Sequence, residues 1–184
     1  MKLTETELDG VLIIEPNVYE DARGFFLETY HQNRYRELGI HSDFVQDNMS
    51  FSKKRTLRGL HFQHPQDQAK LVQVAKGTVF DVVVDVRRGS PTFGKWAGAY
   101  LSDEKMRQIF IPEGFAHGFC VISEYAVFMY KCSNFYAHEC EGGILWSDPD
   151  LNIQWPVEDA LVSEKDMKLP CLKDLATDML PVYQ

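Results

Sequence analysis

The sequence lacks the segments that mark several large classes of protein. No apolar run in its 184 residues approaches the roughly 20 residues that a membrane span requires. It has neither a glycine-rich dinucleotide loop nor a Walker motif, so a Rossmann or kinase-type site is not expected. It has 4 cysteines but no Cys-x-x-Cys spacing, which favours free, largely buried thiols over disulfides or zinc ligands.

Positive charge is also scarce. The chain has 19 lysines and arginines against 27 aspartates and glutamates, which gives a formal net charge of -8. Duplex binding needs a clustered positive face, so no nucleic-acid partner is expected. Arg23 and Arg58 can still form a local positive pocket for an anionic small ligand. The first residues lack the basic segment and apolar core of a secretory signal, so a cytoplasmic location is expected.

Short β-type runs separated by turn residues dominate the middle of the chain. Their spacing is typical of an all-β sandwich or barrel. The dipeptide Lys76-Gly77 is expected to join the first two runs as a tight hairpin. The expected strands are Lys70–Ala75, Thr78–Val86, Lys95–Leu101, Gln108–Ile111, His117–Ile122 and Tyr125–Cys132.

Helical signal is weak and lies outside this region. It is confined to His31–Leu38, which Gly39 would end, and to Leu175–Leu180. The length fits one domain over residues 1–184, with an N-terminal arm and a C-terminal helical tail. Antiparallel sandwiches have exposed edge strands, and arms that cross to a second subunit are one way to cover them, so a homodimer is expected.

The segment Thr56–Gln63 sets titratable side chains into otherwise apolar β sequence. Burying Arg58 and His61 costs free energy unless each has a partner, so the segment predicts a site. His61 and Gln63 share one face of a strand, which would turn His61 toward a polar cavity. A lone histidine is more often a core residue bonded to a backbone carbonyl, so the interpretation depends on further groups nearby.

Two such groups lie in neighbouring expected strands. Taken singly, Lys70 is better interpreted as a solvated strand end and Tyr130 as a core aromatic. Together with His61 they supply a base, an acid and a cation, which suit proton abstraction next to a carbonyl. Stereochemical inversion also requires a proton to leave one face of the carbon and another to arrive on the opposite face.

Other polar residues suggest a ligand site more weakly. Arg23–Glu28 and Gln46–Ser50 combine a cation, amides and aromatics that suit a nucleotide, although a turn followed by an ordinary strand explains Arg23–Glu28 equally well. Metal binding is not expected, because the histidines form no His-x-His pair with a nearby glutamate. Asp81 and Asp85 share one face of an apolar strand and are expected to partner buried bases.

Five motifs along the chain can be considered together. The segment Ser163–Asp166 alone indicates a helix N-terminus or a carboxylate that orients a histidine. The motifs are Arg58-Gly59-Leu60-His61-Phe62-Gln63, Ile111-Pro112-Glu113-Gly114-Phe115-Ala116-His117-Gly118-Phe119, Tyr130-Lys131-Cys132, Trp146-Ser147-Asp148-Pro149-Asp150 and Ser163-Glu164-Lys165-Asp166. In this order they resemble the dTDP-4-dehydrorhamnose 3,5-epimerase family, and the resemblance runs from about Gly10 to Leu172.

This resemblance implies a cupin-type jelly roll, a homodimer, and an epimerase without metal or cofactor that acts on dTDP-4-dehydro-6-deoxy-D-glucose. By motif match, His61 is the base, Asp166 its orienting carboxylate, Tyr130 the acid and Lys70 the group that stabilises the enolate. Tyr136 competes with Tyr130 for the acid role. The implied substrate-binding residues are Arg23, Glu28, Gln46, Asn48, Arg58, His117, Glu141 and Lys165.

Alternatives to double epimerisation stay open. Relatives that epimerise a single carbon share most of these motifs, and a non-catalytic domain that binds a nucleotide sugar needs many of the same side chains. A base and an acid that face each other favour catalysis over binding alone.

Overall fold

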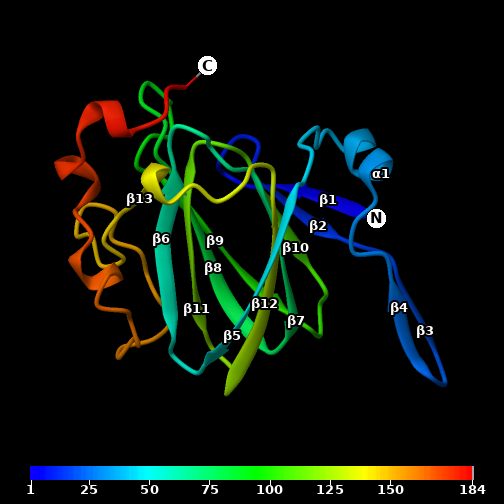
Figure 1. Ribbon diagram of the computed structural model, residues 1–184. Helices are drawn as coiled ribbons and strands as arrows, with labels where there is room; N and C mark the ends of the chain where they lie inside the picture. The colour runs from blue at the N-terminus through cyan, green and yellow to red at the C-terminus, as the bar shows by residue number, and fades with distance from the viewer. Residues whose placement is uncertain (184) are drawn as a thin grey trace.

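A computed structural model describes residues 1–183 and consists mainly of antiparallel strands in two facing sheets (Figure 1). The all-β jelly-roll architecture expected from the sequence is confirmed. One sheet has 6 strands, in the order β1 (Lys2–Glu5), β2 (Leu12–Glu15), β10 (Gln108–Ile111), β7 (Lys70–Lys76), β12 (Tyr125–Cys132) and β5 (Gln46–Lys53). The other has 5, in the order β13 (Glu141–Gly143), β6 (Leu57–Gln63), β11 (Phe115–Val121), β8 (Thr78–Asp85) and β9 (Trp96–Ser102).

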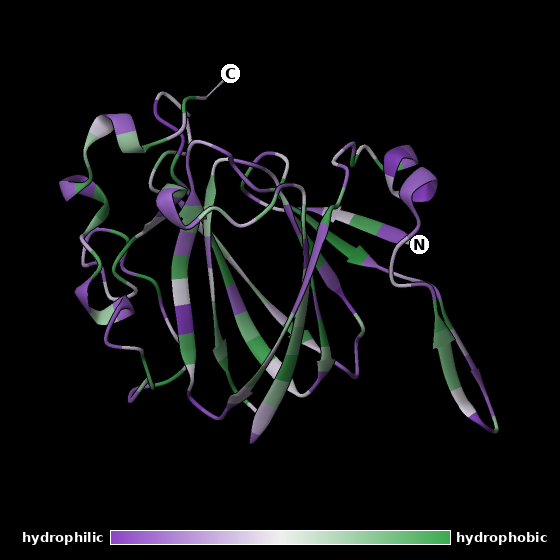
Figure 2. Cartoon of the chain, viewed as in Figure 1, coloured by the Kyte–Doolittle hydropathy of each residue, from purple (hydrophilic) through white to green (hydrophobic). Residues whose placement is uncertain are grey.

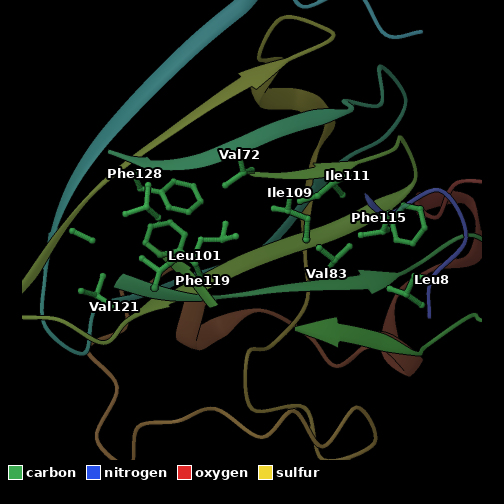
Figure 3. Packing of buried hydrophobic residues seen from close by; sticks show 14 residues of the cluster. Leu8, Val72, Val83, Leu101, Ile109, Ile111, Phe115, Phe119, Val121 and Phe128 are labelled. Carbon is green, nitrogen blue, oxygen red and sulfur yellow. The ribbon is translucent and has the colours of Figure 1, made fainter. Parts of the chain in front are cut away.

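The strand alternation predicted from the sequence positions the core between the sheets. Val72 on β7 and Val83 on β8 point inward from opposite sheets and are buried in one cluster (Figure 3). The rings of Phe119 on β11 and Phe128 on β12 stack across the gap with centroids 3.9 Å apart. Apolar burial of this kind is the main favourable contribution to folding, and here it holds the two sheets face to face.

The segment after β13, residues 144–183, covers the outer face of the five-stranded sheet (Figure 1). The prediction of a helix over Leu175–Leu180 is wrong, because the chain forms only the short 3-10 turns η3 (Leu172–Asp174) and η4 (Thr177–Met179) there. Leu172 and Leu180 are both buried against the sheet. Leu175 and Ala176, between the two turns, have extended backbone with ψ of 136° and 138°, so the segment is not a continuous helix.

The other helix prediction is confirmed. Helix α1 spans Gln32–Glu37 and is followed by Gly39, whose φ of 87° suits a left-handed residue after a helix. Tyr35 is buried on its inner side and donates a hydrogen bond to Gln108 Oε1 at 2.6 Å. Within residues 1–183, no helix is long and apolar enough to cross a membrane.

The six predicted strands are present, but one predicted connection is wrong. β7 and β8 lie in different sheets and do not pair, so Lys76-Gly77 is a crossover between sheets rather than a hairpin. Gly77 has φ of 87°, and a Cβ at this position would lie 2.1 Å from the Tyr125 carbonyl oxygen and 2.6 Å from Ser123 Oγ. The turn residue was identified correctly, but a two-residue turn signal does not specify which sheet receives the next strand.

Replacing Gly77 by valine is expected to lower the free energy of unfolding by about 1–3 kcal/mol or more, from the strained φ and the close approach together. Thermal unfolding followed by circular dichroism measures the effect. Gly89→Val is the matched control, because Gly89 has φ of 83° but nothing within 4 Å of the added Cβ. Equal melting temperatures for the two variants would contradict a special role for the crossover.

A hairpin of β3 (Val18–Asp21) and β4 (Gly24–Leu27) forms a separate two-stranded sheet that projects from the body of the molecule (Figure 1). Figure 2 shows hydrophobic residues along β4. Phe26 is 69% exposed. An exposed apolar arm of this kind is a common sign of an interaction surface.

Candidate functional site

A cleft of about 680 Å³ opens between the two sheets. This volume lies in the range of small-molecule sites. A smaller hollow of about 230 Å³ shares Asn48, His61, Lys70 and Tyr130 with it. The four shared residues include the predicted base, acid and cation.

His61 lies on β6 with a buried carboxylate behind it. Its Nε2 is 2.7 Å from Asp166 Oδ1, although 105 positions separate the two residues in the chain. Burial alone would raise the pKa of Asp166, but the hydrogen bond and charge of His61 and the amide of Gly59 hold that pKa below its ordinary value. An ionised carboxylate at Nε2 fixes the proton there in the neutral ring, so Nδ1 keeps the lone pair that can accept a proton.

A close approach of two glycines shapes the strand next to His61. Gly59 has φ of 118°, and a Cβ there would lie 2.6 Å from Gly118 Cα on β11. The Gly59 N–H donates to Asp166 Oδ2 at 3.3 Å. The pairing of β6 and β11 shifts register at this point. The local irregularity thus releases a backbone donor from the ladder and turns it to the carboxylate that orients His61.

Tyr130 and Lys70 lie on the opposite wall of the cleft. Tyr130 is on β12 and Lys70 on β7, both in the six-stranded sheet, whereas His61 belongs to the five-stranded sheet. Burial raises the pKa of the Tyr130 phenol, which keeps it protonated. Burial lowers the pKa of Lys70, and the charges of Cys132, Asp81 and Glu141 partly offset this effect. The structure therefore brings the three predicted groups to one cleft. The acid and the base lie on opposite walls of it.

His117 forms a second pair with a buried carboxylate. It is the register partner of His61 on the neighbouring strand, and its Nε2 is 2.9 Å from Asp81 Oδ2. Asp81 is fully buried, and this burial raises its pKa, an effect that His117 and Lys70 oppose. The predicted role of Asp81 as a partner for a buried base is confirmed. Asp85 likewise pairs with Arg87, at 2.7 Å.

β5 contributes Asn48 and Ser50 to the cleft and Gln46 to the smaller hollow. Gln46 Nε2 donates to Asn48 Oδ1 at 3.1 Å, and Arg58 Nε donates to Ser52 Oγ at 3.1 Å. These bonds hold Asn48 and Arg58 in the cleft, from opposite sheets, and Gln46 in the adjoining smaller hollow; all three were predicted from the sequence. A guanidinium fixed through its Nε keeps its two terminal nitrogens for an anionic ligand.

Glu141, Lys165 and Tyr136 form the rim. Lys165 Nζ lies 2.5 Å from Glu141 Oε2, and the Tyr136 hydroxyl donates to the same oxygen at 3.0 Å. Burial would raise the pKa of Glu141, but Lys165 and Tyr136 together lower it. The rim therefore carries an ionised carboxylate next to one cation, so it is polar without a large net charge.

Two predicted binding residues lie outside this cleft. Arg23, at the turn of the β3–β4 hairpin, has a side chain that is 90% exposed and pairs with Asp21 at 2.6 Å. Glu28 pairs with Arg34 at 2.8 Å. Neither residue lines the two hollows described above. Their contact with a ligand remains a prediction, because neither residue lines the cleft of its own chain.

Some groups at the site carried no signal in the sequence. The segment Leu161–Ser163 lines the cleft and reaches it through a bridge between Leu161 and Thr56. Gln63 was expected only to share a face with His61, but its amide anchors the loop that carries Tyr136. Among residues 1–183, no group of three or more histidine, cysteine, aspartate or glutamate side chains is arranged to hold a metal ion.

The arrangement is suited to moving a proton across a carbon atom. A base oriented by an ionised carboxylate and a protonated phenol approach from opposite walls, with an ammonium near both. A ketone between them would place its oxygen, which becomes negative when the neighbouring C–H is deprotonated, within the field of the ammonium.

Comparison with known proteins gives a consistent result. The family model described as dTDP-4-dehydrorhamnose 3,5-epimerase matches residues 5–174. A dTDP-4-dehydrorhamnose 3,5-epimerase of Shigella flexneri is 55% identical over 169 residues, which cover 91% of this chain and 93% of that protein.

Solved structures agree. A dTDP-6-deoxy-D-glucose-3,5-epimerase from Legionella pneumophila Philadelphia 1, in complex with dTDP-4-keto-L-rhamnose, is 51% identical with a TM-score of 0.97, covering 100% of this chain and 98% of that one. ChmJ, a 3'-monoepimerase from Streptomyces bikiniensis in complex with dTDP-quinovose, is 33% identical with a TM-score of 0.91, covering 97% of this chain and 92% of that one.

Proposed function

The chain belongs to the dTDP-4-dehydrorhamnose 3,5-epimerase family, and on that premise we propose that its cleft inverts C3 and C5 of dTDP-4-dehydro-6-deoxy-D-glucose to give dTDP-4-dehydro-L-rhamnose. The protein is accordingly an isomerase. The observation that carries the proposal is the division of base and acid between the two sheets, with His61 held by Asp166 at 2.7 Å.

The first step is deprotonation next to the C4 ketone. His61 Nδ1 takes the proton from C3, the C–H electron pair forms a C3–C4 double bond, and the carbonyl pair moves to the C4 oxygen. The Lys70 ammonium stabilises that oxygen as it becomes negative. Asp166 stabilises the imidazolium that forms on His61, in the way that a buried carboxylate supports a catalytic histidine.

The second step delivers a proton to the other face of the same carbon. Tyr130 gives its phenol proton to C3 as the C4 carbonyl re-forms, and the configuration is inverted. His61 then releases its proton to solvent and Tyr130 regains one, so that the site returns to its starting state. The same sequence at C5, the other carbon next to the ketone, completes the double inversion.

The remaining cleft residues are assigned to ligand binding. Arg58 and His117 supply donors for the diphosphate, and Gln46 and Asn48 supply amides for the nucleoside or sugar. Glu141 and Lys165 hold the rim. Side chains alone provide the acid, the base and the cation in this assignment, so it requires no cofactor.

We extend the proposal to a homodimer in which the β3–β4 hairpin of one subunit supplies Arg23 and Glu28 to the cleft of the other. Two observations support it. The hairpin projects from its own body and is apolar along β4 (Figure 2). Met49 on β5, at the edge of the cleft, is 71% exposed. Two exposed apolar surfaces on one chain fit a two-fold interface.

Mixed dimers test this arrangement. Arg23→Ala and His61→Ala variants are each expected to be weak or inactive alone. Subunit exchange between them should restore activity, because a mixed dimer contains one cleft with both His61 and a partner arm that carries Arg23. If Arg23 served its own subunit, no mixed dimer would contain a complete cleft, and mixing would restore nothing. Sedimentation velocity measures the oligomeric state independently.

Deuterium incorporation tests the reaction itself. The protein is incubated with dTDP-4-dehydro-6-deoxy-D-glucose in deuterated water, and the sugar protons are followed by NMR. Loss of both the C3 and C5 signals, together with formation of the L-sugar, is expected, because each inversion takes its new hydrogen from a group that exchanges with solvent. Exchange at one carbon alone would indicate a single-position epimerase, as ChmJ is named.

Retention of all sugar protons despite measurable ligand affinity would instead indicate a non-catalytic binding domain.

A cytoplasmic location is also part of the proposal. All 4 cysteines are free, and Cys120, Cys132 and Cys140 are buried, which suits a reducing compartment.

A further inference from the structure

The carboxylate that orients His61 lies on a short turn and not on a strand. Asp166 begins η2 (Asp166–Lys168), which lies against β6. Its Oδ1 is 2.7 Å from His61 Nε2. A 3-10 turn of three residues has little stiffness of its own, so contacts outside the turn must set the distance between these two side chains.

A glycine opposite His61 accommodates one such contact. Gly143 on β13 is buried and is the register partner of His61 on β6. An added Cβ at Gly143 would lie 2.8 Å from Leu169 Cδ1 and 2.9 Å from Leu169 Cδ2. Leu169 ends η2, and its backbone N–H donates to the Asp166 carbonyl. The side chain of Leu169 thus fills the space that the glycine leaves beside the base.

The chain that follows Leu169 is fastened in place. The Leu145 N–H donates to the Pro170 carbonyl at 2.8 Å. The Leu172 N–H donates to the buried carboxylate of Asp148 at 2.7 Å. A displacement of Leu169 therefore cannot be relieved by the chain that follows it, and the η2 turn has to take it up.

The strand that carries the glycine is fixed to the strand that carries the base. Leu60, next to His61, exchanges two backbone hydrogen bonds with Ile144, next to Gly143, at 2.9 and 3.3 Å. Paired backbone groups of this kind make β6 and β13 one rigid unit. The distance between Asp166 and His61 thus depends on how η2 packs on that unit.

We propose that Leu169, packed on Gly143, is a positioning residue for catalysis, which holds η2 so that the Asp166 carboxylate reaches His61. The inference rests on the function proposed above, because it concerns the same base. Leu169 lines neither hollow of the site, so it acts through Asp166 and not on the ligand. Precise placement matters here, since a misplacement of about 1 Å can lower a catalytic rate roughly 10²-fold.

Exchanging the sizes of the two residues tests the contact. Leu169→Ala empties the space and Gly143→Ala competes for it, so each variant alone is expected to lower kcat roughly tenfold. KM is expected to stay within about threefold of the parent value, because ligand binding is not altered. In the double variant Gly143→Ala/Leu169→Ala, kcat should be at least about threefold above that of either single variant. The added Cβ would also lie 3.0 Å from the Leu60 carbonyl oxygen, so recovery is expected to be partial.

Gly142→Ala is the matched control. An added Cβ at Gly142 would lie 2.6 Å from Phe62 Cζ, which belongs to the outer apolar cluster. This variant should lower the melting temperature as Gly143→Ala does, but its kcat should stay within about threefold of the parent value. An equal fall of kcat in the two glycine variants would overturn the proposal, because a general loss of stability would then explain both. Absence of any recovery in the double variant would overturn it as well.

Proton NMR follows the pair of His61 and Asp166 without turnover. A ring N–H that donates to a carboxylate gives a downfield resonance, which Leu169→Ala should shift upfield or abolish and Gly142→Ala should retain. In an Asp166→Asn background, Leu169→Ala should lower kcat far less than in the parent. An unchanged resonance in Leu169→Ala, an equal fall of kcat in both backgrounds, or a rise of KM without a fall of kcat would each overturn the proposal.

The outcome can be told apart from failure of the proposed function. If the parent protein did not epimerise the sugar, the ring N–H resonance in the parent and in Leu169→Ala would still decide whether Leu169 positions Asp166. If Gly143→Ala does not fold, judged by circular dichroism, Leu169→Ala and its cycle with Asp166→Asn decide alone. Loss of the fold in both single variants would overturn the proposal in favour of a purely structural role.

Discussion

Replacing His61 by alanine is expected to lower kcat by roughly 10²–10⁴-fold, the range over which a positioned general base accelerates proton transfer. The variant removes the group that accepts the proton and leaves the buried Asp166 carboxylate without its hydrogen bond from His61. Deuterium incorporation at C3 and C5 should fall by the same factor, because neither carbon can be deprotonated efficiently. Steady-state kinetics and NMR exchange measure the two effects in one sample.

His64→Ala is the matched control for this experiment. His64 also pairs with an aspartate, with Nδ1 2.9 Å from Asp67 Oδ2, and it is partly buried on the same segment of chain. It does not line either hollow of the site. It should therefore retain epimerase activity. A folded His61→Ala protein that retained parent rates would refute the assignment of the base.

Replacing Tyr130 by phenylalanine is expected to lower the rate of inversion by roughly 10²–10³-fold, the effect of losing a general acid. The base is intact in this variant, so hydrogen at C3 and C5 should still leave and return on one face, and inversion should suffer more than exchange. Comparing deuterium incorporation with formation of the L-sugar separates the two. The expected result is exchange that exceeds inversion, a combination that loss of His61 cannot produce.

Two other tyrosines serve as comparisons for Tyr130. Tyr125 lies on the same strand outside the cleft and stacks on Phe51, so Tyr125→Phe should retain parent kinetics. Tyr136→Phe keeps the ring at the rim and loses only the hydroxyl bond to Glu141, so its kcat should fall far less than that of Tyr130→Phe. The reverse order would assign the acid to Tyr136.

The alternation of side chains between the two faces of a strand explains which features could be predicted from the sequence. The two-residue period placed His61 and Gln63 on the face opposite Leu60 and Phe62, and the structure has the latter two in the outer apolar cluster. Such predictions depend only on backbone geometry within one strand. The bounds of the strands in the middle of the chain were recoverable for the same reason.

Connections and distant pairs were not recoverable from local signals. The turn at Gly77 was visible, but the sheet that receives β8 depends on the packing of the whole core. The pairing of His61 with Asp166 spans 105 positions and followed from family resemblance rather than from spacing. The hydrogen bonds from Gln63 to the loop that carries Tyr136 depend on the path of that loop. The sequence around a glutamine does not indicate which groups it will bond.

The division of the reacting groups between two sheets has a consequence for protein engineering. Packed sheets lie about 10 Å apart, a spacing set by the side chains between them. The stacked rings of Phe119 and Phe128 lie between these two walls and line the cleft as well as the core. A substitution chosen to improve heat resistance by filling this region would also alter the distance between acid and base. The stereochemical purity of the product should therefore be assayed in any thermostabilised variant.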